Sequence, residues 1–149
     1  MQRRNTKGFT LIELLVVIAI IGLLSTLAVV ALNSARTKSR DAKRVSDIKQ
    51  VQTALELYYA DNNAYPTEAS GVELGTGDQL VLCSTGWDAS ACAAGETTNM
   101  GKVPDDPIAA NAYTYTSADG TLYSIAFSLE TDVGSLAKGA HTATPDGIN

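Results

Sequence analysis

An uninterrupted apolar segment near the N-terminus constrains this chain more than any other feature. Nineteen residues from Leu14 to Leu32 carry no charged side chain. As a helix they would rise by about 1.5 Å per residue, which nearly crosses a membrane hydrocarbon core of about 30 Å. A single carboxylate, Glu13, immediately precedes this run. Because an unpaired carboxylate at membrane depth costs about 2 to 3 kcal/mol or more, we expect Glu13 to have a function and a partner.

A short basic segment lies before the apolar run. The first eight residues, MQRRNTKG, contain Arg3, Arg4 and Lys7 but no acidic residue. They end in Gly8, and the string FTLIEL follows. This junction resembles the processing site of the type IV pilin and pseudopilin family, in which a short basic leader is cut after the glycine.

The resemblance implies a role for three residues. A leader of residues 1–8 would be cleaved between Gly8 and Phe9, and the new amino terminus of Phe9 would be N-methylated. In that family the carboxylate corresponding to Glu13 pairs with the terminal amine of a neighbouring subunit during filament assembly. A buried ion pair adds little over an apolar pair, whereas a stranded charge is costly, so this pair would set register more than strength.

The N-terminal segment also has features of a secretory signal and of a membrane anchor. An ordinary secretory signal has a basic start as well, and Val29–Ala31 resembles its small-residue cleavage site, but its apolar region is typically about 7 to 15 residues. An uncleaved membrane anchor would need an apolar helix of about this length. The first residue of the mature protein distinguishes the three, because Phe9 indicates a pilin, Leu32 a secretory signal and Met1 an anchor.

Charge is distributed unevenly along the chain. Residues 1–49 contain nine basic and three acidic residues, whereas residues 50–149 contain two lysines and thirteen acidic residues. The acidic distal half does not suit non-specific binding to nucleic-acid phosphates. The basic cluster from Arg36 to Lys49 is interrupted by Asp41 and Asp47 and has few interleaved aromatic residues, which argues against nucleic acid as a partner. We expect this cluster to face anionic lipid headgroups or acidic surfaces of neighbouring subunits.

Basic residues flank the apolar segment on both sides, so charge alone does not orient it in a membrane. The family resemblance places the leader in the cytoplasm, and the two cysteines of the distal half fit an oxidising compartment. We therefore expect a single-pass cytoplasmic membrane protein with its N-terminus inside and its C-terminal domain outside. After assembly the protein would form a cell-surface or periplasmic filament.

The segment after the apolar run predicts that the helix continues. Residues 33–60 contain no proline or glycine, and apolar side chains recur at spacings of three, four and seven. The string Asp61-Asn62-Asn63, followed by Tyr65-Pro66, predicts its end. We expect a transmembrane half over residues 9–32 and an amphipathic half over residues 33–61 with a charged opposite face. The apolar stripe comprises Ala35, Ala42, Val45, Ile48, Val51, Leu55, Tyr58 and Tyr59.

Residues 62–149 predict a small, β-rich extracytoplasmic domain, which makes the fold class α+β and pilin-like. A single layer of antiparallel sheet packed on the helix is the economical way to build its core. Gln79–Cys83 is a plausible strand, and Ala112–Ser117 and Leu122–Leu129 predict a hairpin around Asp119-Gly120. The core face is expected to carry Tyr113, Tyr115, Tyr123, Ile125, Phe127 and Leu129, packed against Val45, Ile48, Leu55 and Tyr59 of the helix.

Two cysteines, Cys83 and Cys92, bracket the eight residues STGWDASA. A disulfide closing a loop of about ten residues would stabilise the domain by about 2.5 to 3 kcal/mol in the chain-entropy model. Free thiols are the alternative, and an extracytoplasmic location favours the disulfide. A zinc site is disfavoured, because His141 is the only histidine and no further cysteines complete a ligand set.

No catalytic constellation is recognisable, so we do not expect an enzyme. His141 has no serine or cysteine partner motif, which favours a solvated histidine in a C-terminal tail. Residues 103–129 resemble, more weakly, the C-terminal region of the major pseudopilins of type II secretion, where a loop after the last strands binds calcium. Asp132 lies near the corresponding place and Asp146 is a further candidate ligand, but the glycine-rich acidic loop is replaced by ETDVGS at residues 130–135. Calcium needs six to eight oxygen ligands, and this spacing is not diagnostic of a site.

Together these features predict a structural subunit of a type IV pilus-like filament, processed by a prepilin peptidase/methyltransferase and polymerised through its N-terminal helix. The expected partners are identical subunits, the processing enzyme, the membrane-embedded assembly machinery and, before assembly, the membrane. One alternative is the major pseudopilin of a type II secretion system. An alternative from another class is a membrane-anchored binding module that never polymerises.

Overall fold

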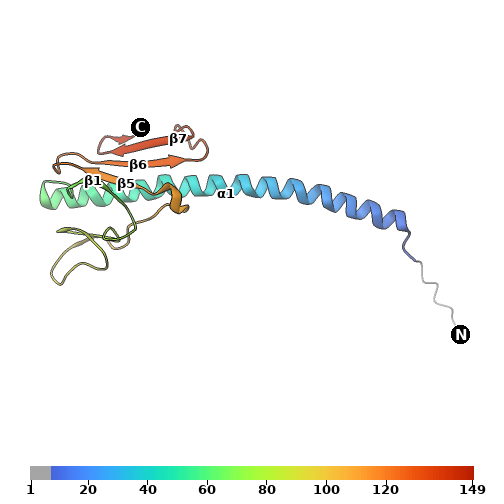
Figure 1. Cartoon of the computed structure of the whole chain (residues 1–149), viewed down its shortest axis with the longest axis horizontal. Helices are drawn as coiled ribbons and strands as arrows, with labels where there is room; N and C mark the ends of the chain where they lie inside the picture. Colours follow the sequence, from blue (N-terminus) through green and yellow to red (C-terminus); the bar gives the residue numbers. More distant parts are fainter. Residues whose placement is uncertain (1–7) are drawn as a thin grey trace. The chain divides into compact units, whose positions relative to one another are not determined.

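The computed structural model of the chain describes residues 8–149 and divides into two compact units at Arg36 and Thr37. The predicted leader residues Arg3, Arg4 and Lys7 lie outside the described residues. One helix, α1 (Leu11–Asn62), contributes to both units (Figure 1). The remaining elements all belong to the second unit. They are β1 (Glu68–Glu73), β2 (Val81–Cys83), β3 (Gly86–Asp88), β4 (Thr98–Met100), the short 3-10 helix η1 (Ala109–Asn111), β5 (Thr114–Ser117), β6 (Ser124–Leu129), β7 (Gly139–Thr144) and β8 (Gly147–Ile148).

The first unit consists of the apolar part of α1 and the residues before it. Every residue from Gly8 to Arg36 is exposed, including all those with large apolar side chains. The hydroxyls of Ser25 and Thr26 donate to the carbonyls of Ile21 and Leu23 at 2.7 and 2.8 Å, which satisfies these polar groups within the helix itself. Among the described residues, α1 is the one helix long and apolar enough to span a membrane. A signal sequence meets the same criteria of length and composition.

The second half of α1 ends where the sequence predicted. Asn63 follows the helix in the left-handed region, with φ of 54°. Its N–H donates to the carbonyl of Tyr59 at 2.8 Å, and the Asn62 side chain donates to the carbonyl of Tyr58 at 3.0 Å. Asparagine is among the few residues that adopt this conformation readily, so it can satisfy the last helical carbonyls and turn the chain.

The larger sheet has five antiparallel strands in the order β1-β5-β6-β7-β8. Its centre is the predicted hairpin, in which Tyr115 of β5 pairs with Ile125 of β6. The turn contains Gly120 with φ of 77°, where an added Cβ would come within 2.9 Å of the carbonyl oxygen of Tyr65. That position requires both positive φ and the absence of a side chain, which only glycine provides without strain. The turn that the Asp119-Gly120 pair predicted is therefore present.

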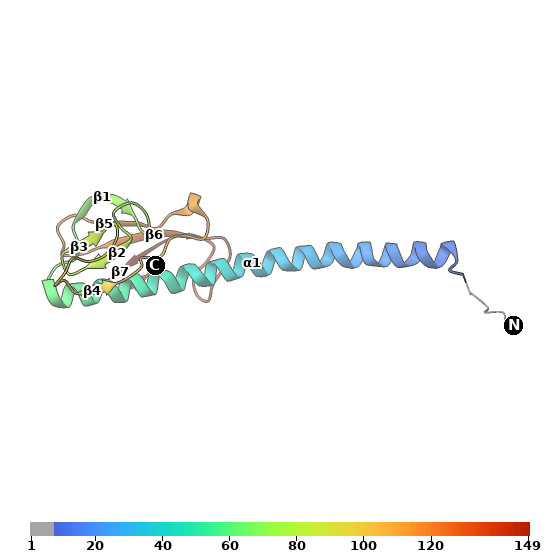
Figure 2. The ribbon, with the colours of Figure 1, turned by 90° about the horizontal axis from the view of Figure 1, so that it is seen from below.

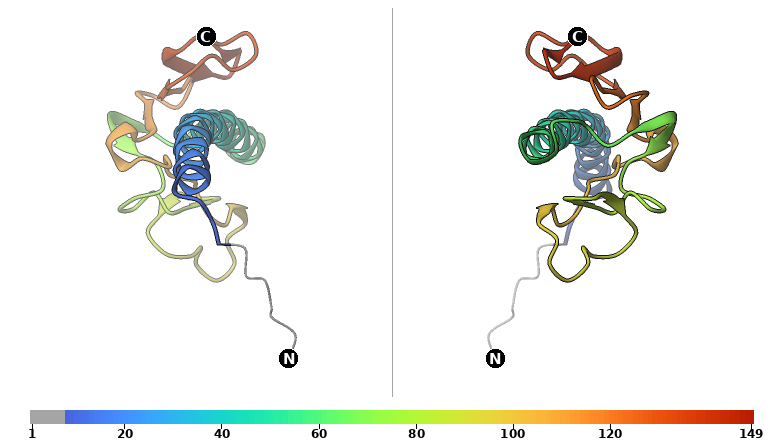
Figure 3. Two further views of the ribbon diagram at one scale, coloured as in Figure 1. Left: turned by 90° about the vertical axis from the view of Figure 1, so that its right-hand side faces the viewer. Right: turned by 90° about the vertical axis from the view of Figure 1, so that its left-hand side faces the viewer.

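A second, three-stranded sheet with the order β3-β2-β4 was not predicted. The expectation of a single sheet is therefore wrong, although the α+β, pilin-like class is confirmed. In the second unit the larger and the smaller sheet lie on different sides of α1 (Figures 1 and 3). Figure 2 views the molecule from below relative to Figure 1 and shows the strands of the smaller sheet, β2, β3 and β4. The predicted strand Gln79–Cys83 is shortened to β2, whereas β3 and β4 have three residues each and no alternating pattern to reveal them.

The core of the second unit joins α1 to both sheets. The six side chains predicted on the core face of the hairpin are all buried, as are Ile48 and Leu55 of α1. Val45 is partly buried, but Tyr59 is 38% exposed and packs on the ring of Tyr65 at a centroid distance of 4.7 Å. The expected placement of Tyr59 in the core is therefore wrong. The core also contains Leu74, which follows β1 of the larger sheet, Leu82 of β2 and Val103, which follows β4.

Two leucines of α1 provide a matched test of this core. Leu55 is fully buried, whereas Leu57 is 54% exposed. We expect Leu55→Ala to lower the free energy of unfolding by about 2 to 5 kcal/mol, because it leaves a cavity in the core. Leu57→Ala should change it by no more than about 0.5 kcal/mol. Urea denaturation of the full chain in detergent, followed by near-UV circular dichroism, measures both, and equal losses would contradict the described packing.

Candidate processing and assembly segment

The predicted cleavage junction lies in an exposed, irregular segment. Gly8, Phe9 and Thr10 precede the first residue of α1, and the Phe9 side chain is 83% exposed. Among the described residues other than Gly8 and its chain neighbours, no atom lies within 4 Å of the position that a Cβ on Gly8 would occupy. In the described chain, neither helical hydrogen bonding nor packing therefore blocks access to the peptide bond between Gly8 and Phe9.

Thr10 and Glu13 form a reciprocal cap at the start of α1. The backbone N–H and the hydroxyl of Thr10 donate to Oε2 of Glu13 at 2.8 and 2.6 Å, and the N–H of Glu13 donates to Oγ1 of Thr10 at 3.3 Å. This is the capping-box arrangement, which satisfies backbone donors that the first turn of a helix leaves free. The role of Thr10 was missed, although the sequence Thr10-Leu11-Ile12-Glu13 carries its signature.

The carboxylate of Glu13 therefore has a partner within its own chain. Both hydrogen bonds from Thr10 reach Oε2, and Oε1 has no bond to the residues that the structure describes. Beside it lies a hollow of about 430 Å³, lined by Phe9, Ile12, Glu13, Val16 and Val17. The segment thus presents a carboxylate oxygen next to an apolar recess at the N-terminal end of an exposed apolar helix.

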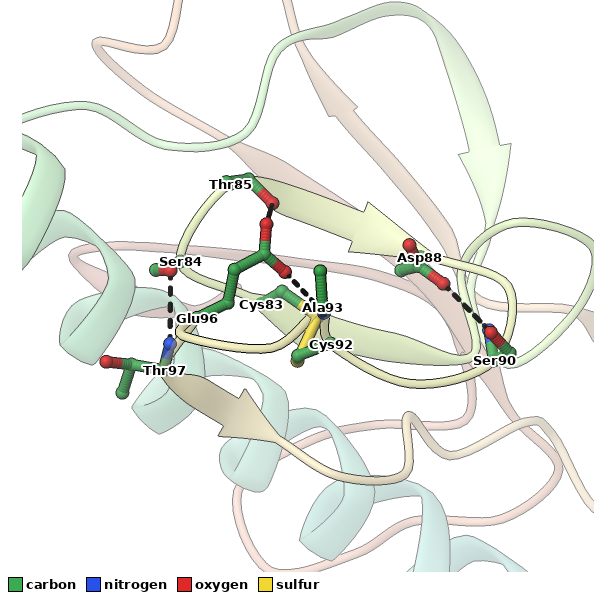
Figure 4. Close-up of a disulfide and its surroundings, with 9 residues drawn as sticks. All are labelled: Cys83, Ser84, Thr85, Asp88, Ser90, Cys92, Ala93, Glu96 and Thr97. Carbon is green, nitrogen blue, oxygen red and sulfur yellow. Dashed lines mark hydrogen bonds between the residues drawn. A yellow bond between two sulfur atoms is a disulfide. The ribbon is translucent and has the colours of Figure 1, made fainter.

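The predicted disulfide is present in the second unit. Cys83 and Cys92 are bonded, with their Cα atoms 5.4 Å apart. Figure 4 shows that the Glu96 carboxylate, close to the disulfide, accepts bonds from the Thr85 hydroxyl and the Ala93 N–H, both at 2.9 Å. Cys83, Cys92 and Glu96 form the one group in residues 8–149 with three metal-ligating side chains close together. Because both sulfurs are used in the disulfide, this group does not offer thiolate ligands.

A cluster of charged side chains, here called the arginine cluster, lies where α1 meets two loops. It comprises Arg40, Asp41, Arg44, Asp106 and Glu130. Arg44 is fully buried and donates to Asp106 at 2.6 and 3.0 Å, to Asp41 at 2.7 Å and to Glu130 at 2.8 Å. Arg40 donates to the two carboxylate oxygens of Glu130 at 2.9 and 2.7 Å.

The arginine cluster corrects, for Arg44, the expectation that the basic residues from Arg36 to Lys49 form a surface for lipid headgroups or neighbouring subunits, whereas Arg36, Lys38, Lys43 and Lys49 are exposed. Arg44 and Asp41 are buried inside the domain, and Asp47 is buried nearby. Charge counts along the sequence did not reveal this, because Arg44 occupies the same helical face as the apolar stripe. The available signal was its spacing, since Arg44 lies four residues before Ile48 and seven before Val51.

The electrostatic environment of the arginine cluster favours ionised carboxylates. Hydrogen bonds from Arg40 and then Arg44 lower the pKa of Glu130 to about 2. Burial opposes ionisation of Asp41, but hydrogen bonds from the backbone of Glu130, from Thr131 and from Arg44 together lower its pKa. The pKa of Asp47 is shifted in the opposite direction. Burial raises it, although the positive charge of Lys43 and a hydrogen bond from Tyr113 act to lower it.

His141 is not in a solvated tail, as the sequence had suggested. It lies on β7, and its ring nitrogens are 2.6 Å from the carbonyl oxygen of Ala137 and 3.0 Å from that of Asn149. Its ring centroid lies 5.6 Å from that of Phe127 on β6. The small residues around it, Gly139-Ala140 and Thr142-Ala143-Thr144, gave no strong strand signal, so β7 was missed.

Asp132 and Asp146, the candidate calcium ligands, lie in different loops. Asp132 lies between β6 and β7, where one carboxylate oxygen accepts the N–H of Lys138 at 2.7 Å. Asp146 lies in the turn between β7 and β8. Within the described part of the chain, neither belongs to a group of three metal-ligating side chains whose ligand atoms lie close together.

An N-terminal apolar helix with a capped Glu13, joined to a helix-and-sheet domain, defines a pilin-like protein. Comparison with known families agrees, because the prokaryotic N-terminal methylation motif matches residues 3–29. The type II secretion system protein G family matches residues 31–132, more than half of the chain. The chain belongs to this protein G family.

Individual relatives cover a shorter stretch. The type II secretion system core protein G of Aeromonas hydrophila is 45% identical over 73 residues, which are 49% of this chain and 51% of the relative. That of Pseudomonas aeruginosa is 42% identical over 73 residues, with the same coverage. That of Escherichia coli is 46% identical over 67 residues, which are 45% of this chain and 46% of the relative. The chain thus spans about half the length of these curated relatives, and no solved structure matches it significantly.

The arginine cluster generates a prediction about acid stability. Because folding lowers the pKa of Glu130 from 4.5 to about 2, its stabilising contribution is complete above about pH 5 and is lost as the pH falls toward about 2. Because folding also lowers the pKa of Asp41, its protonation likewise reduces stability as the pH falls. Folding raises the pKa of Asp47, so its protonation increases stability instead. Replacing Glu130 by glutamine should lower stability at pH 7 and flatten the decrease between about pH 5 and 2.

Urea denaturation at several pH values measures this effect. Glu73→Gln is the matched control, because Glu73 is exposed on β1 and its side chain has no ion pair within residues 8–149. We expect the control to retain the unmodified pH profile. If Glu130→Gln and the unmodified chain lose stability equally over this pH range, Glu130 does not contribute in this way.

Proposed function

We propose that this chain is a pseudopilin of a type II secretion system, a structural subunit that polymerises through its N-terminal helix. The observation that carries the proposal is the exposed Gly8–Phe9 junction placed directly before the capped Glu13 and a helix whose apolar side chains are all exposed up to Arg36. Membership of the protein G family favours secretion over the broader expectation of a type IV pilus. As a filament subunit the chain needs no catalytic site.

The exposed apolar helix needs two successive environments. Exposed apolar side chains between Leu11 and Leu32 have no partners in their own unit, so water is an unfavourable surrounding for them. We propose that lipid covers them before assembly and that the helices of identical subunits cover them afterwards. The membrane-embedded assembly machinery would mediate this transfer.

The proposed division of the chain follows from this change of environment. Residues 1–8 form the leader, residues 9–32 the membrane and assembly half of α1, and residues 33–61 its amphipathic half. Residues 62–149 form the domain outside the cytoplasmic membrane, where the Cys83–Cys92 disulfide fits an oxidising compartment. In this orientation the leader faces a cytoplasmic prepilin peptidase/methyltransferase, and the finished filament lies in the periplasm or at the cell surface.

The first test is the N-terminus of the mature protein. We expect mass spectrometry of protein isolated from cell membranes to find Phe9 as the first residue, carrying one N-methyl group. Gly8→Leu should leave the leader attached, because a large side chain at the cleavage position would obstruct the peptidase. Gly101→Leu, a substitution at an exposed glycine of the other unit whose backbone does not require positive φ, is the control for effects of the substitution itself. A mature N-terminus at Leu32 or Met1 would exclude the proposed processing.

The second test addresses the role of Glu13 in assembly. In the proposed filament its carboxylate pairs with the amine of Phe9 in a neighbouring subunit, so Glu13→Leu should abolish filaments while the protein remains in the membrane. Glu73→Leu makes the same chemical change on exposed β1 and should leave assembly intact. Electron microscopy of sheared filaments and membrane fractionation measure the two outcomes. Unchanged filaments from Glu13→Leu would refute assembly by this pairing, and a membrane-bound protein that never forms filaments would support the binding-module alternative.

A further inference from the structure

We infer that Arg40 and Arg44 order the loop between β6 and β7 in place of a bound divalent cation, so that this domain folds independently of calcium. The loop comprises residues 130–138. The inference concerns the folding of the unassembled subunit and does not depend on the proposed filament function.

The first attachment of the loop is made by the arginine cluster. Two cationic side chains of α1 converge on Glu130, the first residue after β6: Arg40 with bonds of 2.9 and 2.7 Å and Arg44 with one of 2.8 Å. Arg44 also donates twice to Asp106 before η1, so a single guanidinium connects α1 to two separate loops. Arginine suits this role because its planar group carries five donors and retains its charge at any physiological pH.

The second attachment uses the carboxylate of Asp41. It accepts the backbone N–H groups of Glu130 at 3.0 Å and Thr131 at 2.8 Å, and also the hydroxyl of Thr131 at 2.7 Å. Asp41 is fully buried and also accepts a bond from Arg44. The charge of this carboxylate is therefore compensated inside the protein, and the backbone at the start of the loop is fixed to the helix.

The far part of the loop closes on itself. Asp132 accepts the N–H of Lys138 at 2.7 Å, which joins the two ends of the remaining segment. Val133 and Leu136 exchange backbone hydrogen bonds of 2.8 and 3.0 Å. The side chains of both residues pack against the hydrophobic core. Backbone pairing and apolar contacts therefore hold the part of the loop that the arginine cluster does not reach.

The oxygen atoms of this region do not suit calcium. A calcium ion takes six to eight oxygen ligands, usually including several carboxylates. Glu130 and Asp41 already bind guanidinium groups and N–H donors, and one oxygen of Asp132 binds Lys138. In the described chain no two further acidic side chains gather around Asp132. The residues present therefore do not fit a calcium site, and the two arginines supply the positive charge that such an ion would bring.

Thermal unfolding of the full chain in detergent tests the metal independence. We expect the same Tm in millimolar calcium and in excess EDTA, because a ligand raises Tm only if the folded state binds it. A Tm that rises with calcium and falls again with EDTA would overturn the inference. Magnesium chloride at equal ionic strength is the control for non-specific effects of a divalent salt.

Hydrogen exchange tests the positive role of the arginines. Arg40→Gln removes two of the three bonds from arginine to Glu130 but leaves the buried Arg44 in place, so the domain should still fold. We expect severalfold faster exchange at the amides of Glu130 and Thr131, with unchanged exchange in β5. Lys49→Gln, which removes an exposed positive charge from the same helix, should leave the loop amides unchanged. Unchanged exchange at these two amides in Arg40→Gln would show that Arg40 does not order the loop.

Discussion

The buried guanidinium of Arg44 is the interaction on which the arrangement of the domain depends. A buried charge is costly unless it is paired and hydrogen-bonded, and Arg44 is fully buried with bonds to three carboxylates. Those carboxylates come from α1, from the segment before η1 and from the loop that follows β6. Satisfying one cation therefore fixes three parts of the chain, and an alternative packing would leave Arg44 without these partners.

The same helix meets two opposite requirements. Beyond Arg36, α1 buries one face against both sheets, through residues such as Ile48, Val51 and Leu55. Before that point, all of its described side chains are exposed although most are apolar. The domain therefore has a core of its own, whereas the apolar half has no stable aqueous environment. This contrast is the physical reason to propose that lipid and then other subunits cover it.

Periodicity predicted the parts of the fold that bury long, regular apolar patterns. The helix, its end near Asn62 and the hairpin of β5 and β6 were predicted because their core residues repeat at helical or strand spacing. The strands β3, β4 and β7 were missed because they are short or built from small and polar residues whose pairing depends on distant partners. Arg44 was assigned to the surface because a sequence does not show which charged residues find carboxylates across the fold.

At the N-terminus, the predicted partner of Glu13 was sought in another subunit, whereas the structure provides one within the chain. Thr10 donates twice to the carboxylate, so Glu13 already has hydrogen bonds before any assembly. In the proposed filament, the amine of a neighbouring Phe9 would add to these bonds or replace them, and the net gain would be smaller than that of pairing a bare charge. Pairing of Glu13 with this amine would thus add little free energy of association, whereas a subunit in the wrong register would leave a charge unpaired at a large cost. Such a contact suits the setting of register between subunits, while burial of the apolar helix supplies the strength of association.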